Sequence, residues 1–361
     1  MKLTKLKKWY GKYERPLSSL SLIFGFIFDA VTLERIDKVW DNFWVLAHIL
    51  LVAILMVLVH SVKSKPGDET NPQKLQFWLV NILQFVFGGL LSVFLVFYFR
   101  SADLSSSWPF LLILAIAFWA NESLKRHFVR LTFQVSIFFL SLFCCAIFLV
   151  PVLMHEFGTR TFIISGLLSL GSLFLFLYIV SKVSNEKFKT SRSMIFLSVL
   201  GIYVGMNVLY FTNLIPPIPL SIKDSGVYHF IEKNSIGQYV GQFEYKSWED
   251  YFKIYHEYHF VQGETAYAYS AVFSPTSLNT TIVHKWQYYD KVSKHWIQYD
   301  SVLLPVFGGR NGGFRTFSTE RNLTPGKWRV NVETLRGQGI GRIRFNVITS
   351  PADNLKTKIL E

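Results

Sequence analysis

The stretch LTFQVSIFFLSLFCCAIFLVPVLM, residues 131–154, is apolar throughout and contains no charged residue. A helix rises 1.5 Å per residue, so about 20 apolar residues are needed to cross roughly 30 Å of hydrocarbon. This stretch exceeds that length. It therefore predicts a transmembrane helix, and with it an integral membrane protein.

Six further apolar stretches lie on either side of the first one. They are Leu17–Leu33, Phe43–Val62, Phe77–Tyr98, Trp108–Ala120, Thr161–Ser181 and Ser193–Leu214. Two are marginal. Leu17–Leu33 contains an aspartate, and Trp108–Ala120 is short unless Leu104–Ser107 is counted with it. Together the seven stretches predict an α-helical membrane domain with about seven transmembrane helices.

The positive charges between these stretches predict the orientation in the bilayer. If all seven stretches cross, residues 1–16, 63–76, 121–130 and 182–192 face one side and hold sixteen Lys and Arg. The connections on the other side hold four, namely Arg35, Lys38, Arg100 and Arg160. Because cytoplasmic loops carry the excess of Lys and Arg, we expect a cytoplasmic N-terminus and a C-terminal part outside. The net charge of +13 then reflects membrane orientation, and we expect no nucleic-acid partner.

The run Pro216-Pro217-Ile218-Pro219 ends the last apolar stretch, because proline cannot continue a helix. Beyond it, short alternating runs rich in Val, Ile, Tyr, Phe, Thr and Trp are separated by turn residues. The runs are Ala266–Phe273, Thr281–Tyr289, His295–Leu304, Gly313–Ser318, Trp328–Leu335 and Ile340–Ile348. Strands at this spacing predict an all-β, sandwich-like soluble domain. The aromatic and charged segment Ser247–His259 is interpreted as a helix packed on the sheet.

The expected domain organisation has three parts. Residues 1–16 form a basic cytoplasmic N-terminus, 17–219 a multi-span transmembrane domain, and 220–361 an extracytoplasmic β-rich domain. The soluble part contains no cysteine; Cys144 and Cys145 both lie in an apolar stretch. A disulfide framework or a thiolate metal site is therefore excluded in the β-rich domain.

A set of short motifs lies between about residues 280 and 350. The motifs are His284-Lys285-Trp286, Gly308-Gly309-Arg310, Gly313-Phe314-Arg315-Thr316, Pro325-Gly326-Lys327-Trp328-Arg329-Val330, Gly337–Gly341 and Phe345-Asn346-Val347. As a set they resemble the DUF2914 family. This bacterial family of unknown function usually occupies the C-terminus of membrane proteins. The resemblance implies a multi-pass protein of the bacterial inner (cytoplasmic) membrane, with the β-rich domain in the periplasm. It implies no activity and no catalytic residues.

Four residues of these motifs are candidates for ligand binding: His284, Trp286, Arg310 and Arg315. Trp offers a flat face for stacking on a sugar or ring, and Arg a planar fork for carboxylate or phosphate. Strand alternation places His284 and Trp286 on one face of Thr281–Tyr289. The alternative is that Trp286 is a core aromatic residue and that the arginines cap loops.

A second candidate set lies within or beside the apolar stretches. Asp29, His48 and Asn207 fall in the outer halves of their predicted helices, and His155 and Glu156 follow residues 131–154 at the outer surface. Polar groups inside a membrane are costly and often functional, so these five residues are candidates for one outward-facing pocket that includes an Asp29–His48 pair. The alternative is that they are interfacial residues or form hydrogen bonds between helices.

Cofactor and metal motifs are weak. The segment Gly308–Gly313 lacks the Lys-Ser/Thr ending of a phosphate-binding loop, and its glycines are better explained by positive φ in a wide turn. His256 and His259 have metal-binding spacing on a helix but no nearby third ligand. We therefore expect no cofactor and no metal.

Three functions remain open. The favoured one is a non-enzymatic envelope protein whose β-rich domain binds an envelope glycan, a lipid headgroup or a protein partner, with the membrane domain as anchor or relay. The first alternative is a membrane-embedded enzyme acting on a lipid-linked substrate at the outer leaflet. The second is a transporter or a transporter accessory subunit, against which no inverted repeat is visible. The oligomeric state stays open.

Overall fold

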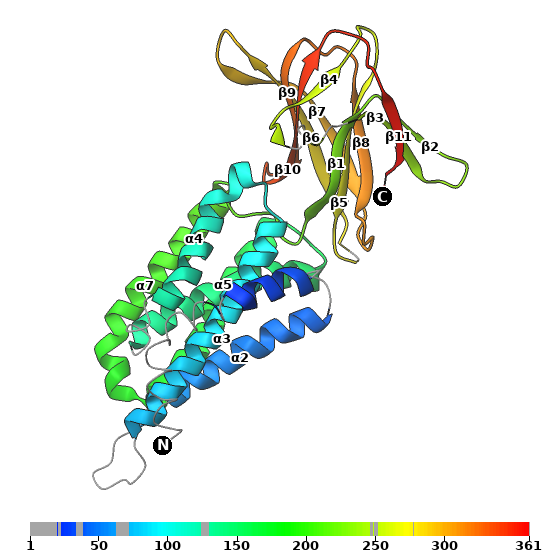
Figure 1. Ribbon diagram of the computed structural model, residues 1–361. Helices are drawn as coiled ribbons and strands as arrows, with labels where there is room; N and C mark the ends of the chain where they lie inside the picture. Colours follow the sequence, from blue (N-terminus) through cyan, green and yellow to red (C-terminus); the bar gives the residue numbers. More distant parts are fainter. Residues whose placement is uncertain are drawn as a thin grey trace. The chain divides into compact units, whose positions relative to one another are not determined.

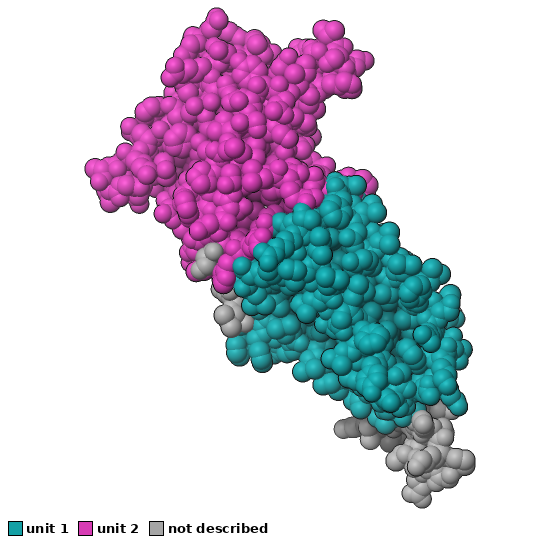
Figure 2. All heavy atoms as spheres, turned by 180° about the vertical axis from the view of Figure 1, so that it is seen from behind, with its two compact units in different colours: residues 1–100, 109–154, 158–212 teal, residues 101–108, 155–157, 213–361 magenta. Residues whose placement is uncertain are grey.

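A computed structural model describes residues 20, 23–33, 39–62, 72–123, 130–245, 248, 252–276 and 278–360. The chain divides into two compact units (Figure 2). Unit 1 comprises residues 1–100, 109–154 and 158–212, and unit 2 comprises residues 101–108, 155–157 and 213–361. The second unit is thus assembled from three separate stretches of chain.

Among the described residues, six helices are long and apolar enough to cross a membrane, and all but the first turn of one of them lies in unit 1 (Figure 1). They are α2 (Val39–Ser61), α3 (Pro72–Arg100), α4 (Leu104–Ser123), α5 (Leu131–Met154), α6 (Thr159–Val183) and α7 (Asn185–Phe211). Leu104–Ser107 belongs to α4, which explains how a marginal apolar stretch reaches the length of a span. A seventh, shorter apolar helix covers Ile23–Thr32. The predicted fold class of helices followed by a β domain is confirmed, with six long spans.

Buried polar side chains in unit 1 form hydrogen bonds between helices. The Gln84 side-chain amide donates to the backbone carbonyl of Asn121, and the Asn121 amide donates back to the carbonyl of Gln84, which links α3 to α4. His60 and Gln134 are bonded at 3.1 Å, which links α2 to α5. Such bonds stabilise helix packing in a medium without water.

The described residues of unit 2 form eleven strands, and together these strands are called the β-domain. They are β1 (Ser221–Tyr228), β2 (Phe230–Lys233), β3 (Tyr239–Glu244), β4 (His256–His259), β5 (Ala266–Phe273), β6 (Thr280–Asp290), β7 (His295–Val306), β8 (Phe314–Glu320), β9 (Gly326–Thr334), β10 (Gly339–Ile348) and β11 (Leu355–Ile359). They form three sheets in the orders β1-β5-β8, β4-β10-β9-β6-β7 and β11-β3-β2. Every pairing is antiparallel except β4 with β10.

The core of the β-domain lies between the five-stranded sheet and the sheet β1-β5-β8. Trp286 on β6, Trp328 on β9 and Phe345 on β10 pack in one buried cluster with Ala266 and Ala268 on β5. The small alanines leave room for the facing tryptophans, so the two sheets approach as in a sandwich. All five side chains are essentially inaccessible to solvent.

The third sheet was not anticipated from the sequence. A second buried cluster, which includes Tyr228, Ile231 and Leu360, joins it to β5. The helix predicted within Ser247–His259 is wrong over its last residues, because His256–His259 form β4 beside β10. The short strand gains a hydrogen-bonding edge there, which outweighs the weak helical preference of an aromatic segment.

Candidate functional site

One face of the five-stranded sheet carries charged and amide side chains instead of apolar ones. Alternate residues of three neighbouring strands point to this face because successive side chains of a strand point to opposite sides. They are Lys285 and Gln287 on β6, Arg329, Asn331 and Glu333 on β9, and Arg342 and Arg344 on β10, with Lys285 ion-paired to Glu333 at 2.8 Å. The residues between them, such as Trp286 and Ile343, lie in the core.

Hydrogen bonds across the strands hold this face in one arrangement. Arg329 Nε donates to Gln287 Oε1 at 2.7 Å, and Asn331 Nδ2 donates to the same oxygen at 3.2 Å. Arg342 Nε donates to Asn331 Oδ1 at 2.5 Å. Two of the three arginines are therefore fixed through their Nε atoms, which leaves their terminal nitrogens for other partners.

The positive charges of this face are close together. Arg329 and Arg344 are directly opposite each other in the β9–β10 register, and Arg342 is two residues from Arg344 on the same strand. Partial burial, and then the charges of Arg342 and Arg344, lower the pKa of Arg329 to about 10. Burial also lowers the pKa of Arg342, against the opposing effect of Asp103. Arg329, with a pKa of about 10, remains charged at neutral pH, but the charges of Arg342 and Arg344 make its charged form less favourable.

Two aromatic rings border the arginines. The guanidinium of Arg329 lies 4.2 Å from the ring centroid of Trp296, a cation–π distance. Tyr255 is stacked on Trp296 with ring centroids 6.5 Å apart, and Lys327 Nζ lies 5.1 Å above Tyr255. We call Arg329, Arg342 and Arg344, together with Trp296 and Tyr255, the arginine face.

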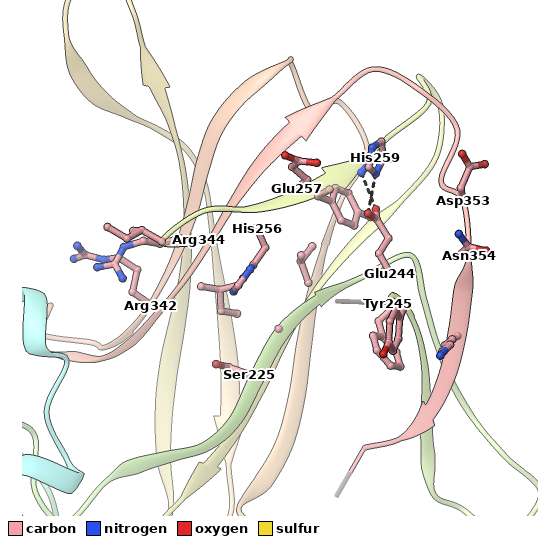
Figure 3. A pocket seen from close by; sticks show the side chains of 17 residues that line it. Ser225, Glu244, Tyr245, His256, Glu257, His259, Arg342, Arg344, Asp353 and Asn354 are labelled. Carbon is pink, nitrogen blue, oxygen red and sulfur yellow. Dashed lines mark hydrogen bonds and ion pairs between the residues drawn. The ribbon is translucent and has the colours of Figure 1, made fainter. Parts of the chain in front are cut away.

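A pocket of about 650 Å³ lies beside β10, lined by residues of β1, β3, β4, β10 and β11 (Figure 3). Glu244, His256 and His259 are directed toward its middle, whereas Arg342 and Arg344 lie together at one side with their guanidinium groups turned away from Glu244. Arg342 and Arg344 line this pocket and also belong to the arginine face, so the pocket and the arginine face share these two residues.

Glu244 is the central charged group of the pocket. Its carboxylate accepts hydrogen bonds from His229 Nε2 at 2.9 Å, from His259 Nδ1 at 2.8 Å and from the His259 backbone amide at 2.7 Å. Burial alone would raise the pKa of Glu244, but these hydrogen bonds lower it. The carboxylate is thus ionised and already satisfied, which suits it to holding β3 against β4 rather than to proton transfer.

A metal centre is not evident in the part of the chain that the structure describes. Within it, no three His, Cys, Asp or Glu side chains are grouped in a way that could hold a metal ion. His256 and His259 lie on β4 and not on a helix, and the imidazole of His259 is bonded to Glu244.

The structure places His284 and Trp286 in the core. Both side chains are fully buried. His284 is bonded to Ser270 at 2.8 Å and to Ser318 at 2.9 Å, and Trp286 Nε1 donates to Ser318 at 2.9 Å. Burial lowers the pKa of His284 to about 4. Trp286 thus occupies the position of a core aromatic residue, and neither side chain presents a surface to a ligand.

The two arginines predicted with them occupy different environments. Arg310 is exposed in the turn before β8, with its guanidinium 5.0 Å from the ring of Phe314. Arg315 is half-buried on β8, where its backbone pairs with Ala271. Neither belongs to the arginine face, so the four predicted residues do not form one site.

The polar residues predicted in the membrane helices also have separate partners. Ser92 donates a hydrogen bond of 2.5 Å to Asp29, and His48 donates from Nδ1 to the carbonyl of Trp44. The side-chain amide of Asn207 donates to the carbonyl of Tyr203 one turn earlier.

His155 and Glu156 belong to unit 2 and are exposed. Asp29 is thus hydrogen-bonded to Ser92 and also lies close enough to His48 for the two side chains to interact electrostatically.

Sequence reasoning missed the arginine face, although a signal was present. Lys327-Trp328-Arg329 and Arg342-Ile343-Arg344 each alternate a basic residue with a core residue. Two such runs in neighbouring strands bring their basic residues together on one face. The pairing of β9 with β10 is what turns two short patterns into a cluster.

Comparison with known proteins identifies the C-terminal part. Residues 279–347 match DUF2914, described as "Protein of unknown function (DUF2914)". No curated protein matches the chain. Among solved structures, the chain is similar to Pseudomonas fluorescens alkylpurine DNA glycosylase AlkC bound to DNA containing an abasic site analog, with 11% identity, 87% of this chain and 100% of that chain covered, and a TM-score of 0.21. A TM-score this low carries no information about the fold or function of this chain.

Proposed function

We propose that this chain, which carries a DUF2914 domain at residues 279–347, is a membrane-anchored binding protein whose β-domain captures an anionic component of the cell envelope. The observation that supports the proposal is the arginine face. The charges of Arg342 and Arg344 disfavour the charged form of Arg329, and the charge of Arg344 disfavours that of Arg342. A bound anion would remove that repulsion, so binding would be favoured by charges already in place.

The chemistry of the face indicates the kind of anion. Guanidinium groups bind carboxylate or phosphate through paired N–H donors, and Arg344 has no ion pair among the described residues. Trp296 and Tyr255 add a flat aromatic border beside the charges. A phosphate or carboxylate attached to a sugar or polyol meets both features. Envelope glycans and the headgroups of anionic lipids share this chemistry.

Arg342 offers a route from the ligand to the membrane domain. Its Nη2 lies 3.5 Å from Asp103 Oδ2, and Asp103 directly precedes α4. A ligand anion on Arg342 would compete with this carboxylate. Occupancy would then change how the first turn of α4 is capped, which supports a relay role for the membrane domain in addition to an anchoring one.

The same proposal includes the location of the protein. We place the β-domain in the periplasm of a bacterium and the spans in the inner membrane, with the N-terminus in the cytoplasm. The bias of Lys and Arg among the connections supports this orientation. The division into units supports it as well. Residues 101–108 and 155–157, which are expected to lie on the outer side of the membrane, belong to the same unit as the β-domain. A reporter fused after Pro219 that is active only in the periplasm would agree with it.

The binding test uses the full-length protein in nanodiscs of zwitterionic lipid. Isothermal titration with a free phosphorylated or acidic saccharide tests the glycan arm, and co-sedimentation with phosphatidylglycerol vesicles tests the lipid arm. Arg344→Gln should weaken whichever ligand binds by about tenfold or more, because a hydrogen bond to a charged group contributes about 1.5–3 kcal/mol. Raising the ionic strength should weaken it as well.

Two further variants make the test specific. Lys233→Gln removes a cation from β2, which lies in another sheet, and should leave binding unchanged. Arg310→Gln tests the turn arginine predicted from sequence, and should also leave binding unchanged if the arginine face is the site. The proposal fails if neither anion binds, or if Lys233→Gln weakens binding as much as Arg344→Gln does.

A further inference from the structure

A groove of about 550 Å³ lies between α6 and α7 in unit 1. Its walls are largely apolar and include Leu173, Phe174, Leu177 and Phe196. The groove exists because α7 is loosely packed. Among the residues of this long helix, the buried ones are Ile195, Met206 and Tyr210. An open apolar groove on a membrane helix is a place where an acyl chain can lie.

One end of the groove is basic. Arg192 is part of its lining, with Tyr178 and Ser181 nearby on α6. Lys182 lies over the ring of Tyr178, with Nζ 5.3 Å from the ring centroid. Arg192 is exposed and forms no ion pair within the described residues. A cation at the end of an apolar groove is the arrangement expected for a molecule with an apolar tail and an anionic head.

Other charges around the junction of α6 and α7 strengthen this end. Lys187 and Lys189 lie in the first two turns of α7, and Glu186 is the acidic residue of its first turn. With Lys182 and Arg192 included, the eleven residues 182–192 contain four cations and one carboxylate. Clusters of Lys and Arg beside a span attract anionic lipid.

We infer that the α6–α7 groove is a binding site for an anionic phospholipid, with an acyl chain along the apolar walls and the phosphate at Arg192. This site shares no residue with the arginine face, and it would hold an acyl chain as well as an anionic group. It therefore goes beyond the proposed function of the β-domain. The acyl chain of a zwitterionic lipid would fit the groove equally well, but its headgroup has no net negative charge to interact with the basic end. Charge therefore sets the preference.

The test is native mass spectrometry of the full-length protein, transferred from detergent containing either phosphatidylglycerol or phosphatidylcholine. The unmodified protein should retain phosphatidylglycerol in preference to phosphatidylcholine. Arg192→Gln should reduce retention of phosphatidylglycerol by about fivefold, the effect of one cation near an anionic lipid surface. Retention of phosphatidylcholine should not change.

Two further variants separate the headgroup from the groove. Arg160→Gln removes a cation at the opposite end of α6 and should leave lipid retention as it is. Val199→Phe adds bulk to the groove lining without changing charge and should reduce retention of both lipids. Equal retention of the two lipids by the unmodified protein would overturn the inference, and so would equal effects of Arg192→Gln and Arg160→Gln.

Discussion

Asp103 and Arg342 form an ion pair, with Asp103 Oδ2 3.5 Å from Arg342 Nη2 and both side chains largely buried. Asp103 also accepts hydrogen bonds from the backbone amide and the hydroxyl of Ser105. One carboxylate therefore serves as the cap of α4 and as the counter-charge of an arginine on β10. These residues are more than two hundred positions apart in the sequence, so the pair joins distant parts of unit 2.

Replacing Asp103 should separate these two roles. Asp103→Ala removes both, and the lost cap alone should cost about 1–2 kcal/mol. Asp103→Asn keeps a capping oxygen but leaves Arg342 without its charge partner, so we expect a smaller loss. Thermal unfolding of the full-length protein in detergent, followed by tryptophan fluorescence, measures both. Equal losses in the two variants would show that the cap contributes nothing.

The buried imidazole of His284 should make the β-domain sensitive to acid. Its pKa is about 4 in the folded protein and 6.5 when exposed, so the unfolded chain binds the proton more readily. Stability is then fully present above pH 6.5 and falls as the pH drops toward 4, by about 3 kcal/mol in total. Unfolding by urea at a series of pH values between 4 and 7 tests this window.

The matched variant for that test is His284→Gln, which keeps polar contacts to Ser270 and Ser318 but cannot be protonated in this range. It should be less stable at pH 7, yet it should lose less stability between pH 6.5 and 4. If its pH dependence equals that of the unmodified protein, another group is responsible.

Glu320 on β8 predicts a pH effect of the opposite sign. Burial, and then the neighbouring Asp300, raise its pKa to about 7. The folded protein therefore holds this proton more tightly than the unfolded chain, and the resulting stability is lost as the pH rises from 4.5 through 7. Glu320→Gln imitates the protonated form. This substitution should raise the melting temperature at pH 8 and have little effect at pH 5. A gain at pH 5 that exceeds the gain at pH 8 would show that the pKa of Glu320 is not raised.

Gly313 precedes β8 and should not tolerate a side chain. Its φ is +87°, and an added Cβ would lie 2.8 Å from the backbone carbon of Ala271. Gly313→Ala should therefore cost more than the roughly 1–2 kcal/mol expected for a left-handed backbone conformation alone. Gly263→Ala is the control, because Gly263 has a φ of +95° but open space around it. Chemical unfolding of both variants separates collision from strain.

Much of the architecture could be predicted because hydrophobic length and alternation are local properties. The stretch 131–154 coincides with α5, and Ala266–Phe273 coincides with β5. The positive φ expected in the glycine-rich turn is present at Gly309 and Gly313. Each of these features is determined by residues that are close together in the sequence, so the local sequence pattern is enough to predict it.

The remaining features depend on pairing between distant residues. β4 is a strand because Phe345–Ile348 offer it an edge, and nothing within 256–259 encodes that partner. The arginine face likewise requires β9 to pair with β10 in one register, since a shift by one residue would move Arg344 into the core. His284 and Trp286 were expected on one face, which is correct, but the sequence does not indicate which face is covered by β5 and β8.

The assembly of unit 2 from three stretches has a consequence for biosynthesis. Residues 101–108 and 155–157 leave the ribosome well before the strands that they accompany, because synthesis proceeds from the N-terminus. Asp103 must therefore wait for Arg342 while four further membrane helices and most of the β-domain are made and inserted. During that interval its charge lacks its final counterpart. The ion pair of Asp103 with Arg342 can therefore form only after β10 has been made, which makes it a late step in the assembly of unit 2.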